Sequence, residues 1–215
     1  MSASTQITLF IGPGCPHCQN MLRLLSDMVK NGGIGRLDVI NIAGLPDEAQ
    51  EAQVRSVPTM LLGQFRLTGA HSLSEIQEWI DKSNSETGLI DYLNQSFDQG
   101  ELEQITEQAR QDNSLLPVML DMLAEPETPI TSRIGISAVL ESFSGQAPLQ
   151  NLIDAICKHA QSKNASVRVD MAHLLGLSHS RDALACLQTL SEDKFADVQE
   201  TAKEAIEEIE VALEN

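Results

Sequence analysis

The chain has 215 residues, enough for two domains of about 100 residues each. Its formal net charge is −17, of which residues 1–84 contribute −2 (8 acidic and 6 basic side chains) and residues 85–215 contribute −15 (23 acidic and 8 basic). Such a charge repels phosphates and predicts no binding to nucleic acid, whereas a basic protein partner would suit the acidic half, unless the charge only keeps that half soluble.

The first predicted elements are a strand over residues 7–11 and an amphipathic helix over residues 16–30, with Cys15-Pro16-His17-Cys18 at their junction. Near the start of a helix, unpaired backbone N–H groups and the positive end of the helix dipole favour a thiolate over a thiol. We therefore expect Cys15 to be a redox nucleophile. Cys18 lies one helical turn further and would attack the mixed disulfide formed at Cys15, which makes it the expected resolving thiol.

Pro16 and His17, the residues between the two cysteines, belong to the same predicted site. His17 would add positive potential beside Cys15 and stabilise its thiolate, unless it is only a polar residue exposed at the helix start. The CxxC motif could instead be half of a zinc or iron–sulfur site, but two further ligands would be needed and no second CxxC or HxxxH pattern follows. We expect no metal and no organic cofactor, because a dithiol itself carries two electrons.

The remaining elements predicted in the first half follow the order strand, helix, strand, strand, helix. They cover residues 36–42, 46–54, 59–62, 65–68 and 72–83. Pro58 opens the strand at 59–62, as expected of a residue that cannot donate a hydrogen bond to a sheet. Gly63-Gln64 is the predicted turn to the next strand. Ser72, followed three residues later by Glu75, predicts a capping box at the start of the last helix.

The CxxC motif at a helix start, Val57-Pro58-Thr59 before a buried strand, and the βαβαββα order resemble the thioredoxin and glutaredoxin superfamily over residues 5–82. The resemblance implies a four-stranded mixed sheet with flanking helices, in which two strand relationships are parallel and two are antiparallel. It also implies that Pro58 is a cis proline packed against the cysteine pair, and that Val57, Pro58 and Thr59 hold the substrate backbone. The Pro-His dipeptide resembles that of the periplasmic disulfide oxidases more than the Gly-Pro of thioredoxin.

A polar stretch at residues 83–88 marks the predicted boundary between a redox domain, residues 1–84, and an all-α domain, residues 85–215. In the second domain, three similar apolar segments begin at Leu115, Leu149 and Ala183, 34 residues apart each time. A predicted partner helix follows each of them. These partner helices cover residues 132–143, 167–177 and 198–213. A fixed period of this size is typical of stacked helix pairs.

The partner helices resemble the second helices of HEAT-type repeats, because a valine followed by a basic or polar residue opens two of them, at Val167 and Val198. Tetratricopeptide repeats share the 34-residue period, but the sequence lacks their tryptophan and glycine-tyrosine signature. We expect a HEAT-like α-solenoid of about four helix pairs from residue 87 onward. Such an array offers a surface for a protein partner, and a basic partner would suit its charge.

Cys157 and Cys186 lie on apolar helical faces, where we expect small buried hydrophobic side chains rather than a redox pair. The sequence starts without the basic and long apolar segments of a secretion signal, and no run approaches the about 20 apolar residues of a membrane span. With one CxxC motif and two isolated cysteines, the pattern predicts a cytoplasmic protein with a catalytic dithiol rather than a disulfide framework.

Together these features predict a thiol:disulfide oxidoreductase whose substrates are protein or small-molecule disulfides and dithiols, with the helical repeats selecting the partner. The alternative is a scaffold or adaptor that binds partners through the repeats and uses the dithiol only to sense redox state. A third hypothesis is metal carriage by the CxxC motif. Catalytic turnover of a test disulfide would separate the first two hypotheses.

Overall fold

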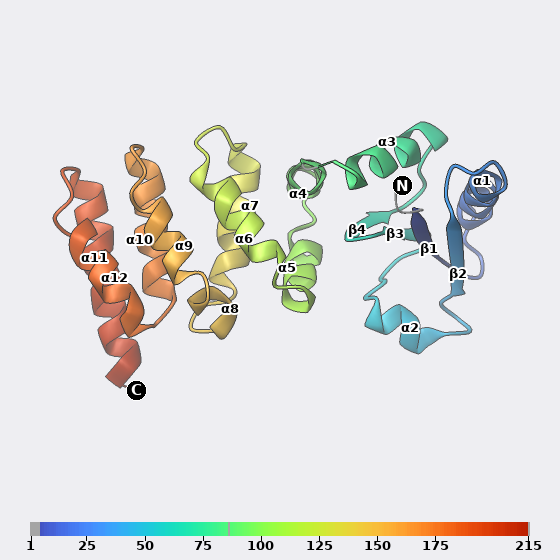
Figure 1. Ribbon diagram of the computed structural model, residues 1–215. Coiled ribbons are helices and arrows are strands. Elements are labelled where there is room, and N and C mark those ends of the chain that lie inside the picture. Colours follow the sequence, from blue (N-terminus) through green and yellow to red (C-terminus); the bar gives the residue numbers. More distant parts are fainter. Residues whose placement is uncertain (1–4, 86, 215) are drawn as a thin grey trace. The chain divides into compact units, whose positions relative to one another are not determined.

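The computed structural model describes residues 5–85 and 87–214, which form two compact units (Figure 1). The first unit runs to Tyr92 and the second begins at Leu93, inside helix α4 (Gly88–Asp98). The domain boundary predicted after residue 84 lies in the connection between α3 (Leu73–Ser83) and α4, and it stays a prediction.

The first unit contains one four-stranded mixed sheet, as the fold class predicted. The strands, in the spatial order β2-β1-β3-β4, are β1 (Gln6–Ile11), β2 (Arg36–Asn41), β3 (Thr59–Leu62) and β4 (Phe65–Thr68). β1 pairs in parallel with β2, and the β1–β3 and β3–β4 pairs are antiparallel. The expectation of two parallel relationships was therefore wrong, since four strands in an open sheet have three neighbouring pairs and only one of these is parallel.

Three helices flank the sheet: α1 (Cys18–Lys30), α2 (Pro46–Glu51) and α3. Figure 1 shows α2 and α3 on opposite sides of the sheet. α1 turns Met21 and Leu25 into the core, where Leu9 of β1 and Met60 of β3 are also buried. α3 begins with the predicted capping box, in which the Ser72 side chain accepts from the N–H of Glu75 and the Glu75 carboxylate accepts from the N–H of Ser72.

An aromatic cluster joins Tyr92 of α4 to the sheet. Tyr92 stacks on Phe65 of β4 with ring centroids 5.0 Å apart, and Trp79 of α3 lies edge-on to both rings, at 5.5 Å from Phe65 and 5.9 Å from Tyr92. The Tyr92 hydroxyl also accepts a hydrogen bond from the backbone N–H of Arg66 at 3.3 Å. These contacts explain why the first compact unit extends past α3.

The second unit is helical, as predicted. After α4 come α5 (Leu102–Gln111), α6 (Leu115–Ala124), α7 (Ile130–Glu141), α8 (Ala147–Gln150), α9 (Ile153–His159), α10 (Ala165–Leu177), the 3₁₀ turn η1 (Arg181–Ala183), α11 (Leu184–Leu190) and α12 (Ala196–Glu214). α10 and α12 include the partner helices predicted at 167–177 and 198–213, whereas α7 begins and ends two residues before the helix predicted at 132–143. The segment that begins at Leu149 is divided between α8 and α9 rather than forming one helix. The HEAT-like identity of this unit stays a prediction.

Two arginine–aspartate pairs link successive helix pairs of the second unit. Arg133 of α7 pairs with Asp170 of α10. Arg168 of α10, only 6% exposed, pairs with both carboxylate oxygens of Asp193 at 2.7 and 2.9 Å and also donates to the Ser162 carbonyl at 2.8 Å. A buried guanidinium needs this many partners, because each unpaired N–H would cost the free energy of its lost hydration.

Within the described part of the chain, 5–85 and 87–214, every helix is too short or too polar to cross a lipid bilayer.

Candidate functional site

The cysteine pair lies in the turn that leads from β1 into α1. Cys15 and Cys18 are joined by a disulfide, with their Cα atoms 5.5 Å apart. Their exposure differs: Cys15 is half-buried, whereas Cys18 is only 5% exposed and faces the core. An incoming molecule therefore reaches the sulfur of Cys15 first.

The start of α1 supplies a hydrogen bond to Cys15. The helix begins at Cys18 rather than at the predicted residue 16, so Cys15 precedes the first turn instead of lying in it. The backbone N–H of Cys18, the first residue of the helix, donates to Cys15 Sγ at 3.0 Å. This N–H has no acceptor within the helix, and such a donor at the positive end of the helix dipole stabilises a negatively charged sulfur.

A second loop, Ser56-Val57-Pro58-Thr59, brings a peptide group beside the same sulfur. Cys15 Sγ lies 3.6 Å from the carbonyl oxygen of Val57, 42 residues further along the chain. The Val57–Pro58 peptide bond is cis. Thr59, 1% exposed, fixes the loop by donating its hydroxyl to the Ser56 carbonyl at 2.8 Å.

The structure thus brings most of the predicted site residues together. Cys15, Cys18 and Val57 are in direct contact through Cys15 Sγ, and Pro58 and Thr59 belong to the loop that holds Val57 in place. Pro16 and His17 are both exposed in the turn before α1, and His17 is its N-cap residue without a side-chain capping hydrogen bond. Their assigned roles stay predictions.

Comparison with known proteins identifies the family to which this part of the chain is similar. The family model described as a thioredoxin domain matches residues 5–81. Two glutaredoxins from Neisseria meningitidis, of serogroup A and serogroup B, are each 32% identical to the chain over 76 residues, which are 85% of either glutaredoxin and 34% of this chain. The chain belongs to the thioredoxin-domain family. Thioredoxin and glutaredoxin-type proteins use a cysteine pair as their redox group without an external cofactor, and the close Cys15–Cys18 pair indicates thiol redox function at this general level.

A third loop of the thioredoxin domain, Gly69 to Ser72, borders the site, and none of its residues was among the predicted site residues. The N–H of Gly69 donates to the Pro58 carbonyl at 2.8 Å, which joins this loop to the cis-proline loop. His71 follows, with its Nε2 atom buried and without a hydrogen-bond partner among the described residues. Hydrogen bonds from the backbone and side chain of Ser72 hold the pKa of Glu75 below its usual range, and the electrostatic effect of the nearby His71 acts in the same direction. A lone histidine after a strand carries no signal that would have identified it.

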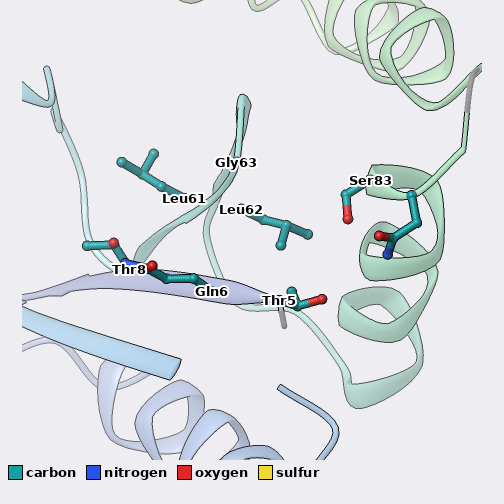
Figure 2. Close-up of a pocket in the computed structure, with 8 residues that line it drawn as sticks. Thr5, Gln6, Thr8, Leu61, Leu62, Gly63 and Ser83 are labelled. Carbon is teal, nitrogen blue, oxygen red and sulfur yellow. The ribbon is translucent and has the colours of Figure 1, made fainter. Parts of the chain in front are cut away.

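The thioredoxin domain also has an open hollow of about 450 Å³ at the other end of the sheet, away from the cysteines. Figure 2 shows Thr5, Gln6 and Thr8 on one side of it and Ser83 at the end of α3 on the other. Its lining holds no charged side chain or thiol. Across residues 5–85 and 87–214, no cluster of three or more histidine, cysteine or acidic side chains is arranged to bind a metal ion.

Proposed function

We propose that the thioredoxin domain is a thiol:disulfide oxidoreductase in which Cys15 is the nucleophile and Cys18 the resolving thiol. In the reducing direction, the Cys15 thiolate attacks one sulfur of a substrate disulfide, and the other substrate sulfur leaves as a thiolate that takes up a proton. Cys18, after losing its proton, then attacks Cys15 Sγ, which releases the second substrate thiol and forms the Cys15–Cys18 disulfide. The reverse sequence oxidises a substrate dithiol.

The observation that carries this proposal is the different surroundings of the two sulfurs. The N–H at the start of α1 donates to Cys15 Sγ, and Cys15 is the more exposed of the two. Cys18 lies beneath it in bonding position. A nucleophile needs access and a stabilised thiolate, whereas a resolving thiol needs only to reach the first sulfur.

We also propose that Val57, Pro58 and Thr59 position the substrate, and that Pro16 and His17 contribute the exposed side of the same site. Support comes from the Val57 carbonyl, which lies 3.6 Å from Cys15 Sγ and two residues before the start of β3. An extended substrate segment that pairs with the backbone of this loop, in the manner of an added strand, would place its disulfide at Cys15. Substrates of this kind are protein or small-molecule disulfides and dithiols.

For the helical unit we propose partner recognition by a HEAT-like array in a cytoplasmic protein. Its charge excess is acidic, so a basic protein surface is the favoured partner. The two cysteines of this unit are free thiols, which agrees with a reducing compartment.

Turnover tests the proposal directly. The full chain should accelerate the reduction of insulin by dithiothreitol, and it should do so at concentrations far below that of insulin. The Cys15→Ser variant is the matched control and should fall to the uncatalysed rate. If the full chain gives only the uncatalysed rate, the dithiol serves at most as a redox sensor on a binding protein, which is the alternative hypothesis.

A further inference from the structure

Gly12 lies where the ends of β1 and β2 meet the cis-proline loop. It is the first residue after β1, and it precedes Cys15 by three positions. In the sheet, β1 lies between β2 and β3. Position 12 is therefore flanked on one side by Ile42, which follows β2, and on the other side by Val57 of the cis-proline loop.

The space beside Gly12 is filled by the side chains of these two neighbours. A Cβ atom added at Gly12 would lie 3.2 Å from Cγ2 of Val57, and 3.3 and 3.4 Å from Cγ1 and Cδ1 of Ile42. Carbon atoms in favourable contact are about 3.5–4.0 Å apart, so a neighbour would have to move by a few tenths of an ångström. The φ angle of Gly12 is not positive, so its backbone would accept an alanine. Packing therefore explains why a glycine fits this position.

Val57 connects Gly12 to the reacting sulfur. Its side chain packs against Gly12, and its carbonyl oxygen lies 3.6 Å from Cys15 Sγ. A valine has a single side-chain torsion, which is strongly restricted, so its methyl groups do not easily turn aside. The Thr59 hydroxyl holds the same loop through its hydrogen bond to the Ser56 carbonyl. A side chain at position 12 would therefore displace the Val57 peptide group, and with it the carbonyl beside Cys15.

On the basis of the proposed function, we propose that Gly12 is a positioning residue, which sets the distance between Cys15 Sγ and the Val57 peptide group. A substrate with an extended peptide segment beside its disulfide needs this distance, because its backbone pairs with the loop while its sulfur reaches Cys15. A small disulfide without a peptide backbone does not need it. The absence of a side chain at position 12 thus favours peptide disulfides as substrates.

Gly12→Ala in the full chain tests this role with two disulfides. The reduced chain is mixed with insulin or with bis(2-hydroxyethyl) disulfide, and loss of the Cys15 and Cys18 thiols is followed by alkylation and peptide mass spectrometry. We expect the rate constant with insulin to fall about fivefold or more, because a small misplacement in an active site costs a large factor in rate. The rate constant with bis(2-hydroxyethyl) disulfide should stay within about twofold of the wild type, because its reaction needs no backbone pairing.

Gly44→Ala is the matched control. The nearest atom to a Cβ added at Gly44 is the Asn41 carbonyl oxygen at 3.6 Å, which is an ordinary contact. The control makes the same change of residue type and has the same effect on the unfolded chain. It should change neither rate constant.

Two further backgrounds show whether Val57 transmits the effect. In a chain that already carries Val57→Ala, the Cγ2 atom is absent, so Gly12→Ala should lower the insulin rate constant by less than about twofold. In a chain that carries Ile42→Ala, Gly12→Ala should still cost about as much as in the wild type. Urea unfolding followed by Trp79 fluorescence measures whether each thioredoxin domain is folded. If Gly12→Ala alone does not fold, adding Val57→Ala should restore the fold.

Three results would overturn the role of Gly12 while leaving the proposed function in place. These are a wild-type insulin rate constant for Gly12→Ala, an equal loss with both disulfides, and a recovery produced by Ile42→Ala but not by Val57→Ala. A wild-type chain that reduces neither disulfide would instead remove the proposed function, and the role of Gly12 with it.

Discussion

At the scale of single residues, the fold gives two cysteines three positions apart different chemistry. Cys15 is half-buried and receives the N–H of Cys18, whereas Cys18 is 5% exposed and faces the core. Hydrogen bonding to a charged sulfur favours that form, and access decides which sulfur an incoming molecule meets. Both effects support the proposed attack by Cys15.

The roles can be separated by serine substitution. Cys18→Ser should accumulate mixed disulfides through Cys15, because nothing resolves them, and Cys15→Ser should accumulate none. The adducts are measured on non-reducing gels and by mass spectrometry after capture of the full chain, and they should disappear with dithiothreitol. Equal trapping by the two variants would remove the assigned roles.

Thr59 is the last residue of the cis-proline loop, and its side chain fixes that loop. Thr59→Val keeps the shape of the side chain but removes the hydroxyl that donates to the Ser56 carbonyl, which should cost about 1 kcal/mol in free energy of unfolding. We expect a lower kcat/KM for insulin reduction, since the Val57 carbonyl beside Cys15 would be held less firmly. Thr68→Val, at an exposed position of β4, is the matched control and should change neither quantity. A Thr59→Val variant with wild-type kinetics would show that the hydrogen bond does not position the loop.

At the scale of elements, the buried Arg168–Asp193 pair holds α10 to the loop between α11 and α12. The side chains of Arg168 and Asp193 are 8% and 13% exposed, so water screens their attraction little. The hydrogen bonds from Arg168 hold the pKa of Asp193 below its usual range. Gly176 on the same helix packs so closely on Ala205 of α12 that an added Cβ would lie 2.8 Å from the Ala205 Cβ. The Arg168–Asp193 pair and the close contact of Gly176 with Ala205 therefore both hold α10 against the following helices.

Removal of the Arg168 guanidinium should lower the free energy of unfolding substantially. Arg168→Met leaves the Asp193 carboxylate without its main partner, and we expect a loss of about 3 kcal/mol in free energy of unfolding. Urea unfolding followed by far-UV circular dichroism measures it, because most helical residues belong to the second unit. Arg181→Ala, at an exposed position of η1, is the control and should fall within about 0.5 kcal/mol of the wild type. A similar small change for Arg168→Met would mean that the pair contributes little net stability.

The Arg168–Asp193 pair also predicts how the free energy of unfolding changes with pH. A carboxyl group whose pKa is lower in the folded chain stabilises the fold above its unfolded pKa of about 3.9, and this stabilisation is lost as the pH falls through the folded pKa. The stability difference between the wild type and Arg168→Met should therefore be full at pH 7 and shrink below about pH 4. Urea midpoints at several pH values measure it, and a difference that does not change with pH would contradict the assignment to Asp193.

At the scale of the whole molecule, the ends of strands and helices could be predicted from the sequence, whereas contacts between side chains far apart in the sequence could not. The strands at 59–62 and 65–68 were predicted to the residue, because Pro58 and Gly63-Gln64 mark their ends. The capping box at Ser72 was also predicted from the sequence, and the structure confirms it. The contact of Tyr92 with Phe65 was missed, because an apolar period shows which face of a helix is covered but not which distant side chain covers it.

Tyr92 provides a test of where the thioredoxin domain ends. It is 2% exposed and packs on Phe65 and Trp79, so Tyr92→Ala should cost about 3 kcal/mol or more in the stability of the first unit, and Tyr92→Phe about 1 kcal/mol.

Trp79 is the only tryptophan of the chain, so its fluorescence reports the unfolding of the first unit alone. Far-UV circular dichroism reports mainly the helices of the second unit. We expect Tyr92→Ala to move the fluorescence transition to a lower urea concentration, while the dichroism transition moves less. A chain that ends after residue 84 should lose as much stability as Tyr92→Ala does. If the dichroism transition moves and the fluorescence transition does not, Tyr92 belongs energetically to the helical unit, and the boundary predicted after residue 84 is the better one.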